Sequence, residues 1–147
     1  MVDLNCAREL STVTLRREMP LAWVDFLASP TDEDFDAYIT FLDEVLALRT
    51  PHVTVVRFAP GSGRLSAAQV RRSSQWIKDN AEVIPQCCSG LAMVFESAAL
   101  RFMLTSFLLM TKIPTAYKVC ANDDEALRWA TEVLGVAPLA RPGGAAA

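Results

Sequence analysis

The sequence is poor in the residue types that build most metal and nucleophile sites. It contains a single histidine, His52, and only four cysteines, Cys6, Cys87, Cys88 and Cys120. Cys87 and Cys88 are adjacent, which is not the C-x-x-C spacing that structural zinc uses, and they lie in an apolar segment where free cysteine behaves as a small buried hydrophobe. We therefore expect no metal site and no disulfide framework.

A surplus of positive charge is also missing. The chain has 14 Lys and Arg against 17 Asp and Glu, a formal net charge of −3. A nucleic-acid binder needs a basic face to neutralise phosphates, and the one basic pair, Arg71 and Arg72, lies among neutral residues. The first ten residues hold no apolar run of the secretory type, and no segment predicts a transmembrane helix. We expect a cytoplasmic protein with no nucleic-acid partner.

The residues that are present suit one folded domain. The chain is 147 residues long and 52% hydrophobic, enough to bury a single core. Periodic patterns run from residue 11 to residue 135, which marks the extent of the predicted domain. Residues 1–10 are expected to be loosely ordered, and residues 136–147, rich in Pro, Gly and Ala, are expected to form a flexible tail.

Within the domain, extended and helical patterns alternate. Two extended runs, 12–16 and 21–27, are close enough to form a hairpin. Three more strands are predicted within 53–58, 87–95 and 115–120, and the apolar run 87–95 is expected at the sheet centre. Helix starts are marked by Thr31 with Asp34, by Ser66 with Gln69 and by Asn122 with Glu125, and another helix is predicted from Ala98 to Thr111. The last helix ends at Gly135.

This order predicts an α/β fold, β-β-α-β-α-β-α-β-α. The three internal helices are crossover connections, which parallel strands require. The sheet is expected to have five strands, mostly parallel, with the first strand antiparallel through the hairpin.

The helix from Ala98 to Thr111 carries more apolar residues than one sheet-facing side needs. Eight of eleven residues are large and apolar: Leu100, Phe102, Met103, Leu104, Phe107, Leu108, Leu109 and Met110. Three explanations remain open, namely a helix buried beneath its neighbours, a dimer contact, or one wall of a pocket for an apolar ligand. The candidate partner or ligand surface comprises Phe102, Met103, Phe107 and Met110.

Catalytic motifs are not found at the strand ends where this class of fold binds ligands. Sites gather outside the carboxyl ends of parallel strands. The Gly61-Ser62-Gly63 loop lies there, but it lacks the lysine of a phosphate-binding loop and the spacing of a dinucleotide fingerprint. It is either a plain turn or a switch, since phosphate on Ser62 or Ser66 would be stabilised by the following helix N-terminus. His52, Cys87 and Cys88 begin their strands, at the opposite end, so no nucleophile and base are predicted to meet.

The element order, with T-D-E-D-F-D at 31–36 and E-A-L-R-W at 125–129, resembles the SpoIIAA-like (STAS) superfamily. The resemblance covers about residues 11–135 and is closest to bacterial STAS/SEC14-like proteins of unassigned function. It implies a scaffold that acts through protein contacts, and in anti-sigma antagonists a phosphorylated serine opens the helix after the third strand. That place is 60–66 here, where the antagonist pattern of Asp followed by Ser-Ser-Gly or Thr-Ser-Gly is missing. The SEC14-like branch implies a lipophilic ligand.

Two functional hypotheses follow. The first is a non-enzymatic cytoplasmic regulatory module that self-associates or docks a protein partner through Phe102, Phe107 and Met110. The alternative is a small-molecule or lipid-binding domain with an apolar pocket beside the helix 98–111. An enzyme is disfavoured, because no nucleophile-base pair, cofactor fingerprint or metal set is visible.

Overall fold

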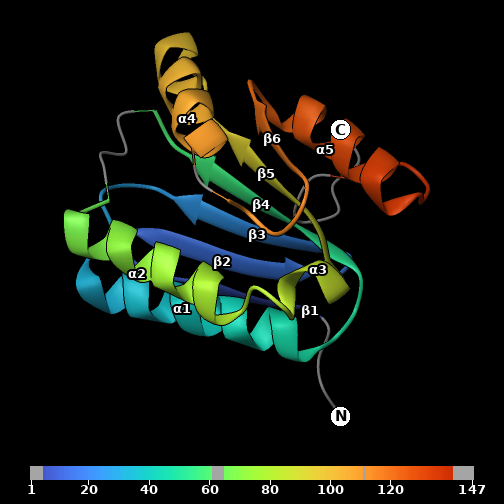
Figure 1. Cartoon of the computed structure of the whole chain (residues 1–147), viewed down its shortest axis with the longest axis horizontal. Helices are drawn as coiled ribbons and strands as arrows, with labels where there is room; N and C mark the ends of the chain where they lie inside the picture. Colours follow the sequence, from blue (N-terminus) through green and yellow to red (C-terminus); the bar gives the residue numbers. More distant parts are fainter. Residues whose placement is uncertain (1–4, 61–64, 111, 141–147) are drawn as a thin grey trace.

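A computed structural model of the chain describes residues 5–60, 65–110 and 112–140. Figure 1 shows an α/β domain in which one mixed sheet separates two layers of helices. The described elements are β1 (Asn5–Glu9), β2 (Val13–Glu18), β3 (Leu21–Phe26), α1 (Asp32–Ala47), β4 (His52–Phe58), α2 (Ala67–Asp79), α3 (Ile84–Cys87), β5 (Cys88–Val94), α4 (Ala98–Met110), β6 (Tyr117–Cys120) and α5 (Asp123–Leu134). No helix in these ranges is long and apolar enough to cross a membrane.

The sheet has six strands in the described residues, one more than the sequence predicts. They lie in chain order, β1 to β6. The pairs β1–β2 and β2–β3 are antiparallel, and the remaining three pairs are parallel. The predicted hairpin and the mostly parallel sheet are therefore confirmed, whereas β5 is next to an edge and the centre is formed by β3 and β4.

The additional strand is β1, which lies within the ten residues expected to be loosely ordered. Its backbone pairs with β2 from Asn5 opposite Glu18 to Glu9 opposite Thr14. The segment has no apolar alternation, because Cys6 and Ala7 are its only hydrophobic residues. The strand pairs through backbone hydrogen bonds, and its side chains show no pattern from which a strand could be predicted.

Alternation along the strands divides the core into two halves. On one face, Phe41 and Val45 of α1 pack against inward side chains of β2 and β3 such as Leu15. On the other face, Leu127 of α5 packs against a layer that includes Trp23. In Figure 1, α1 and α2 cover the first face, α5 covers the second, and α4 stands at the end of the sheet.

The predicted helix caps are confirmed at α2 and α5 and half confirmed at α1. Ser66 and Gln69 form both bonds of a capping box, and α5 is capped by Asn122 and ends at Gly135 with φ +65°. At α1, the Thr31 hydroxyl accepts a bond from the backbone N–H of Asp34. The backbone N–H of Thr31 donates to the Thr12 hydroxyl and not to Asp34, whose carboxylate accepts bonds from Thr12 and Ser11 in the turn between β1 and β2.

Two segments differ from the expected boundaries. Cys87, expected at the start of the strand 87–95, is instead the last residue of the short helix α3, which has Pro85 in its first turn and lies between the end of α2 at Asp79 and β5. At the C-terminal end, Leu139 packs against the core half beneath α5, and its backbone N–H donates to the Thr131 hydroxyl at 3.4 Å. The rest of the predicted tail, 141–147, lies outside the described residues.

Candidate functional site

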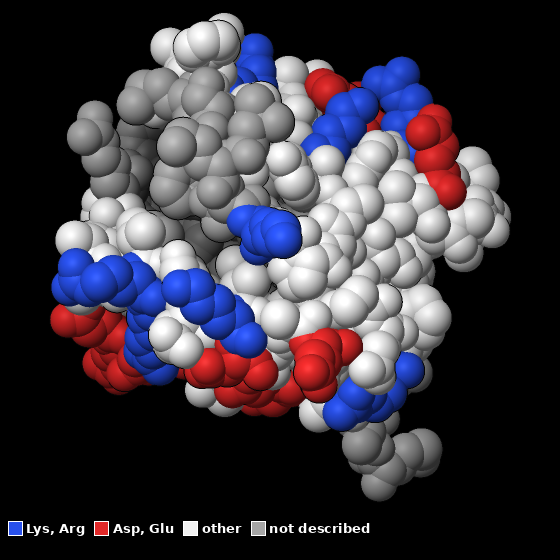
Figure 2. Space-filling view, in the orientation of Figure 1, with Lys and Arg blue, Asp and Glu red and all other residues white. Residues whose placement is uncertain are grey.

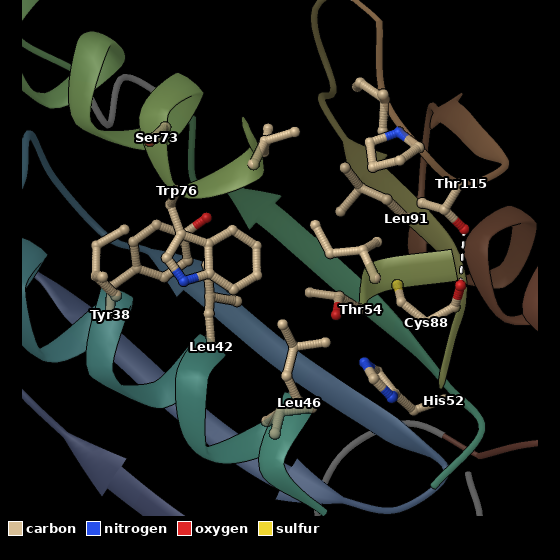
Figure 3. A pocket seen from close by; sticks show the side chains of 16 residues that line it. Tyr38, Leu42, Leu46, His52, Thr54, Ser73, Trp76, Cys88, Leu91 and Thr115 are labelled. Atoms are coloured by element: carbon tan, nitrogen blue, oxygen red, sulfur yellow. Dashed lines mark hydrogen bonds between the residues drawn. The ribbon is translucent and has the colours of Figure 1, made fainter. Parts of the chain in front are cut away.

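An apolar pocket of about 90 Å³ lies between α1, α2 and the sheet. Its 16 described lining residues come from the helices α1, α2 and α3, from the strands β4 and β5 and from the segment before β6, and Figure 3 shows their side chains. Asp, Glu, Lys and Arg are absent from this set of described residues. The lining is Tyr38, Ile39, Leu42, Val45, Leu46, His52, Thr54, Ser73, Trp76, Ile77, Ile84, Cys88, Leu91, Ile113, Pro114 and Thr115.

The two helical walls follow from helical periodicity. Tyr38, Leu42 and Leu46 recur every four residues and so lie on one face of α1. Ser73, Trp76 and Ile77 form the corresponding face of α2. The indole N–H of Trp76 donates to a carboxylate oxygen of Asp43 at 2.7 Å, which ties α2 to α1 beside the pocket.

Charged side chains stay outside this pocket. Figure 2 shows most of them over α1 and α2 along one edge of the molecule and over α5 at another, with a single positively charged group in the mainly uncharged area between. Burial raises the pKa of Tyr38 to about 12, so its phenol is neutral at physiological pH. A bound molecule would therefore meet a neutral, mainly hydrocarbon surface.

The base of the pocket holds most of its polar groups. Strand alternation places His52 and Thr54 on the face toward α1 and α2 and Val53 on the face toward α5. The His52 ring is only 1% exposed, and its Nδ1 lies 2.9 Å from the carbonyl oxygen of Thr50. Pro51 favours the extended backbone at Thr50 that precedes the strand. Burial lowers the pKa of His52, so the ring is neutral at pH 7 and above.

Cys88 and Thr115 close the pocket on the β5 side. The Cys88 thiol lies 3.3 Å from the carbonyl oxygen of Gly90, and the Thr115 hydroxyl donates to the carbonyl oxygen of Cys88 at 2.8 Å. Burial raises the pKa of the Cys88 thiol. A buried protonated thiol is a poor nucleophile, because the thiolate is the reactive form.

The structure brings His52 and Cys88 together, which the sequence analysis did not anticipate. They are register partners on neighbouring parallel strands and both line the pocket. The described hydrogen bonds of the two side chains go to the carbonyl oxygens of Thr50 and Gly90 and not to each other. Because the histidine is neutral and the cysteine is protonated, the two side chains form a polar part of the pocket lining.

The carboxyl ends of the strands, where the sequence analysis expected a site, hold an ion-pair cluster. Arg57 at the end of β4 pairs with Asp25 of β3 and, at 2.9 Å, with Asp123 at the start of α5. Its guanidinium also lies 4.7 Å from the ring centre of Trp23. These contacts join two strands to α5 and occupy the Arg57 side chain with protein partners.

Two residues of the predicted sites, Ser66 and Phe102, are described, and neither lines the pocket. Ser66 is exposed at the N-cap of α2, where its hydroxyl accepts a 3.1 Å bond from Gln69, and Ser62 lies outside the described residues. Phe102 is 75% exposed on α4, and the side chains of Met103, Phe107 and Met110 lie outside the described part. The described lining includes Ile113, Pro114 and Thr115, which follow α4 in the chain, and Leu108 of α4 lies in the same core cluster as the lining residues Leu42 and Leu91.

The pocket residues were not identified from sequence because each has an ordinary structural interpretation. Leu42 and Ile77 match the apolar stripes by which their helices pack on the core. His52 begins its strand, whereas a binding site was expected at the carboxyl end. The one signal for the pocket in the sequence was the polar His52 directly before a strand of β-branched residues. Among the described residues, no group of three or more His, Cys, Asp or Glu side chains could hold a metal ion.

Comparisons with known proteins identify the fold. No protein-family model matches the sequence, and no curated protein is significantly similar to it. A solved structure of an uncharacterised DUF3478-family protein from Shewanella loihica PV-4, described as having a SpoIIAA-like fold, superimposes with a TM-score of 0.59. The two are 15% identical over 88% of this chain and 98% of the other. The resemblance inferred from sequence is therefore confirmed at the level of architecture: the chain has a SpoIIAA-like fold.

Proposed function

We propose that this chain is a non-enzymatic binding domain for a small, mainly apolar molecule held between α1, α2 and the sheet. The observation that carries the proposal is the uncharged pocket itself, whose mainly apolar lining includes a few neutral polar side chains such as His52, Thr54 and Thr115. Small-molecule sites commonly combine an apolar lining with a few convergent polar groups.

Energetics favour an occupant. About 90 Å³ of the pocket is open space, so the side chains that line it lack packing partners on that side. A cavity of about 150 Å³ binds benzene in a well-studied engineered protein, so the present one suits a small ring or short chain whose remainder extends through the opening. Burial of the ligand's hydrocarbon would restore the missing contacts.

A larger side chain introduced into the pocket tests whether the pocket binds the ligand. Ser73 lines the pocket whereas its neighbour Ser74 does not, so Ser73→Leu and Ser74→Leu form a matched pair. Calorimetric titration of the full chain with 1-hexanol should show binding in the wild type and in Ser74→Leu and at least tenfold weaker binding in Ser73→Leu. Solvent extraction of the purified protein should release an apolar compound from the same two proteins. Equal binding by all three would contradict the proposal.

A second candidate is docking of a protein partner, or of a second copy, through α4. Two large apolar side chains of α4 are exposed to solvent, Phe102 at 75% and Leu100 at 45%, and a partner docked on this helix would cover them. The variant Phe102→Ser should then lower the mass measured by light scattering, or abolish binding of a partner, without loss of stability. A wild type that is monomeric at high concentration and unaffected by Phe102→Ser would remove self-association.

A further inference from the structure

The two ring nitrogens of His52 have different surroundings. Nδ1 lies 2.9 Å from the Thr50 carbonyl oxygen, and since a carbonyl only accepts, Nδ1 carries the hydrogen. Among the described residues, Nε2 has no hydrogen-bond partner, although the residue is 99% buried. Figure 3 shows the ring extending from the start of β4 toward the interior of the pocket.

The protonation state of the His52 ring determines whether Nε2 donates or accepts a hydrogen bond. Burial lowers the pKa of His52, so the ring is neutral above pH 7. A neutral imidazole has one N–H and one acceptor nitrogen, and Nδ1 already holds the hydrogen. Nε2 is therefore an acceptor, able to receive a hydrogen bond from a donor that enters the pocket.

Thr54 supplies a complementary group. It lies two residues along β4 on the same face and is 7% exposed, and its hydroxyl has no described hydrogen-bond partner. A hydroxyl both donates and accepts. A ligand oxygen placed between the two side chains would donate its hydrogen to Nε2 and accept one from Thr54.

From this arrangement we infer that the ligand is a neutral alcohol or phenol whose hydroxyl binds at His52 and Thr54, with its hydrocarbon part along α1 and α2. The inference rests on the proposed function. An ether lacks the donor that Nε2 requires. A carboxylate lacks it also and would bring a charge into an uncharged pocket, where desolvation is unfavourable.

Three probes with equal numbers of non-hydrogen atoms test this inference: 1-hexanol, its isomer methyl pentyl ether, and n-heptane. Calorimetric or NMR titrations of the full chain at pH 7.5 should give an affinity for 1-hexanol about fivefold higher than for the ether, the value of one net hydrogen bond. In His52→Asn, the shorter amide can still donate to Thr50 but offers no acceptor at the Nε2 position, so the ratio should fall to about one. The variant His52→Gln, which extends an amide to the Nε2 position, should restore part of the preference.

The outcomes separate the two proposals. Binding of all three probes with equal affinity in the wild type would overturn the hydroxyl inference and leave the apolar pocket intact, whereas binding of none would overturn both. If the variants do not fold, the ¹⁵N chemical shift of Nε2 in the wild type gives the same answer. It should move upfield on addition of 1-hexanol and stay unchanged with n-heptane, and an unchanged shift with a saturating concentration of 1-hexanol would overturn the inference.

Discussion

Trp76 and Asp43 are joined by a 2.7 Å hydrogen bond that ties α2 to α1 at the side of the pocket. Replacement of Asp43 with Ala removes the acceptor and should lower the free energy of unfolding by about 1 kcal/mol. Trp76 should also gain mobility, which its fluorescence anisotropy would report. Asp43→Asn keeps an acceptor oxygen and is expected to stay closer to the wild type. Equal stability of wild type and both variants would show that the bond does not hold the helices together.

Gly90 provides a test of packing on the opposite face of the sheet. A Cβ at this position would lie 2.6 Å from Cη2 and 3.0 Å from Cζ3 of the Trp129 ring. Gly90→Ala must therefore displace the indole, and we expect a loss of about 1–3 kcal/mol in chemical denaturation. The same substitution in a Trp129→Leu background, where the ring is absent, should cost much less. Similar costs in both backgrounds would place the clash elsewhere.

His52 should impose a pH dependence on stability. Burial lowers its folded-state pKa below the ordinary 6.5, so the unfolded chain binds more protons just below that pH. The favourable contribution is complete above about pH 6.5 and is lost as the pH falls from there toward the folded-state pKa. Because His52 is the only histidine, His52→Asn should flatten the denaturation profile between pH 7 and 5. Parallel profiles of wild type and variant would contradict the lowered pKa.

Much of the fold was predictable because its signals are local. Ser66 with Gln69 and Asn122 with Gly135 mark helix ends through contacts within a few residues, and the structure has these caps. The strand β1 was missed because its pairing is made by backbone groups. The Asp34 carboxylate does not form the predicted capping-box bond, because Thr12, which is distant in sequence, donates to it instead.

The pocket was not predictable from the same patterns. Leu42, Trp76 and His52 satisfy ordinary helix and strand patterns, and a cavity depends on how far apart the packed elements lie. Because sites usually gather at the carboxyl ends of strands, a site was predicted at the end of the sheet where Arg57 pairs with Asp25 and Asp123. The pocket instead uses the starts of β4 and β5, where His52 and Cys88 are register partners.

The most direct test of the apolar pocket is a methyl NMR titration of the full chain with 1-hexanol. Methyl groups of Ile77, Ile84 and Leu91, which line the pocket, should shift in a saturable manner. Those of Leu21 and Leu127, in the core half beneath α5, should stay unchanged. The absence of shifts at the three pocket residues, or shifts of equal size on both faces of the sheet, would contradict the account.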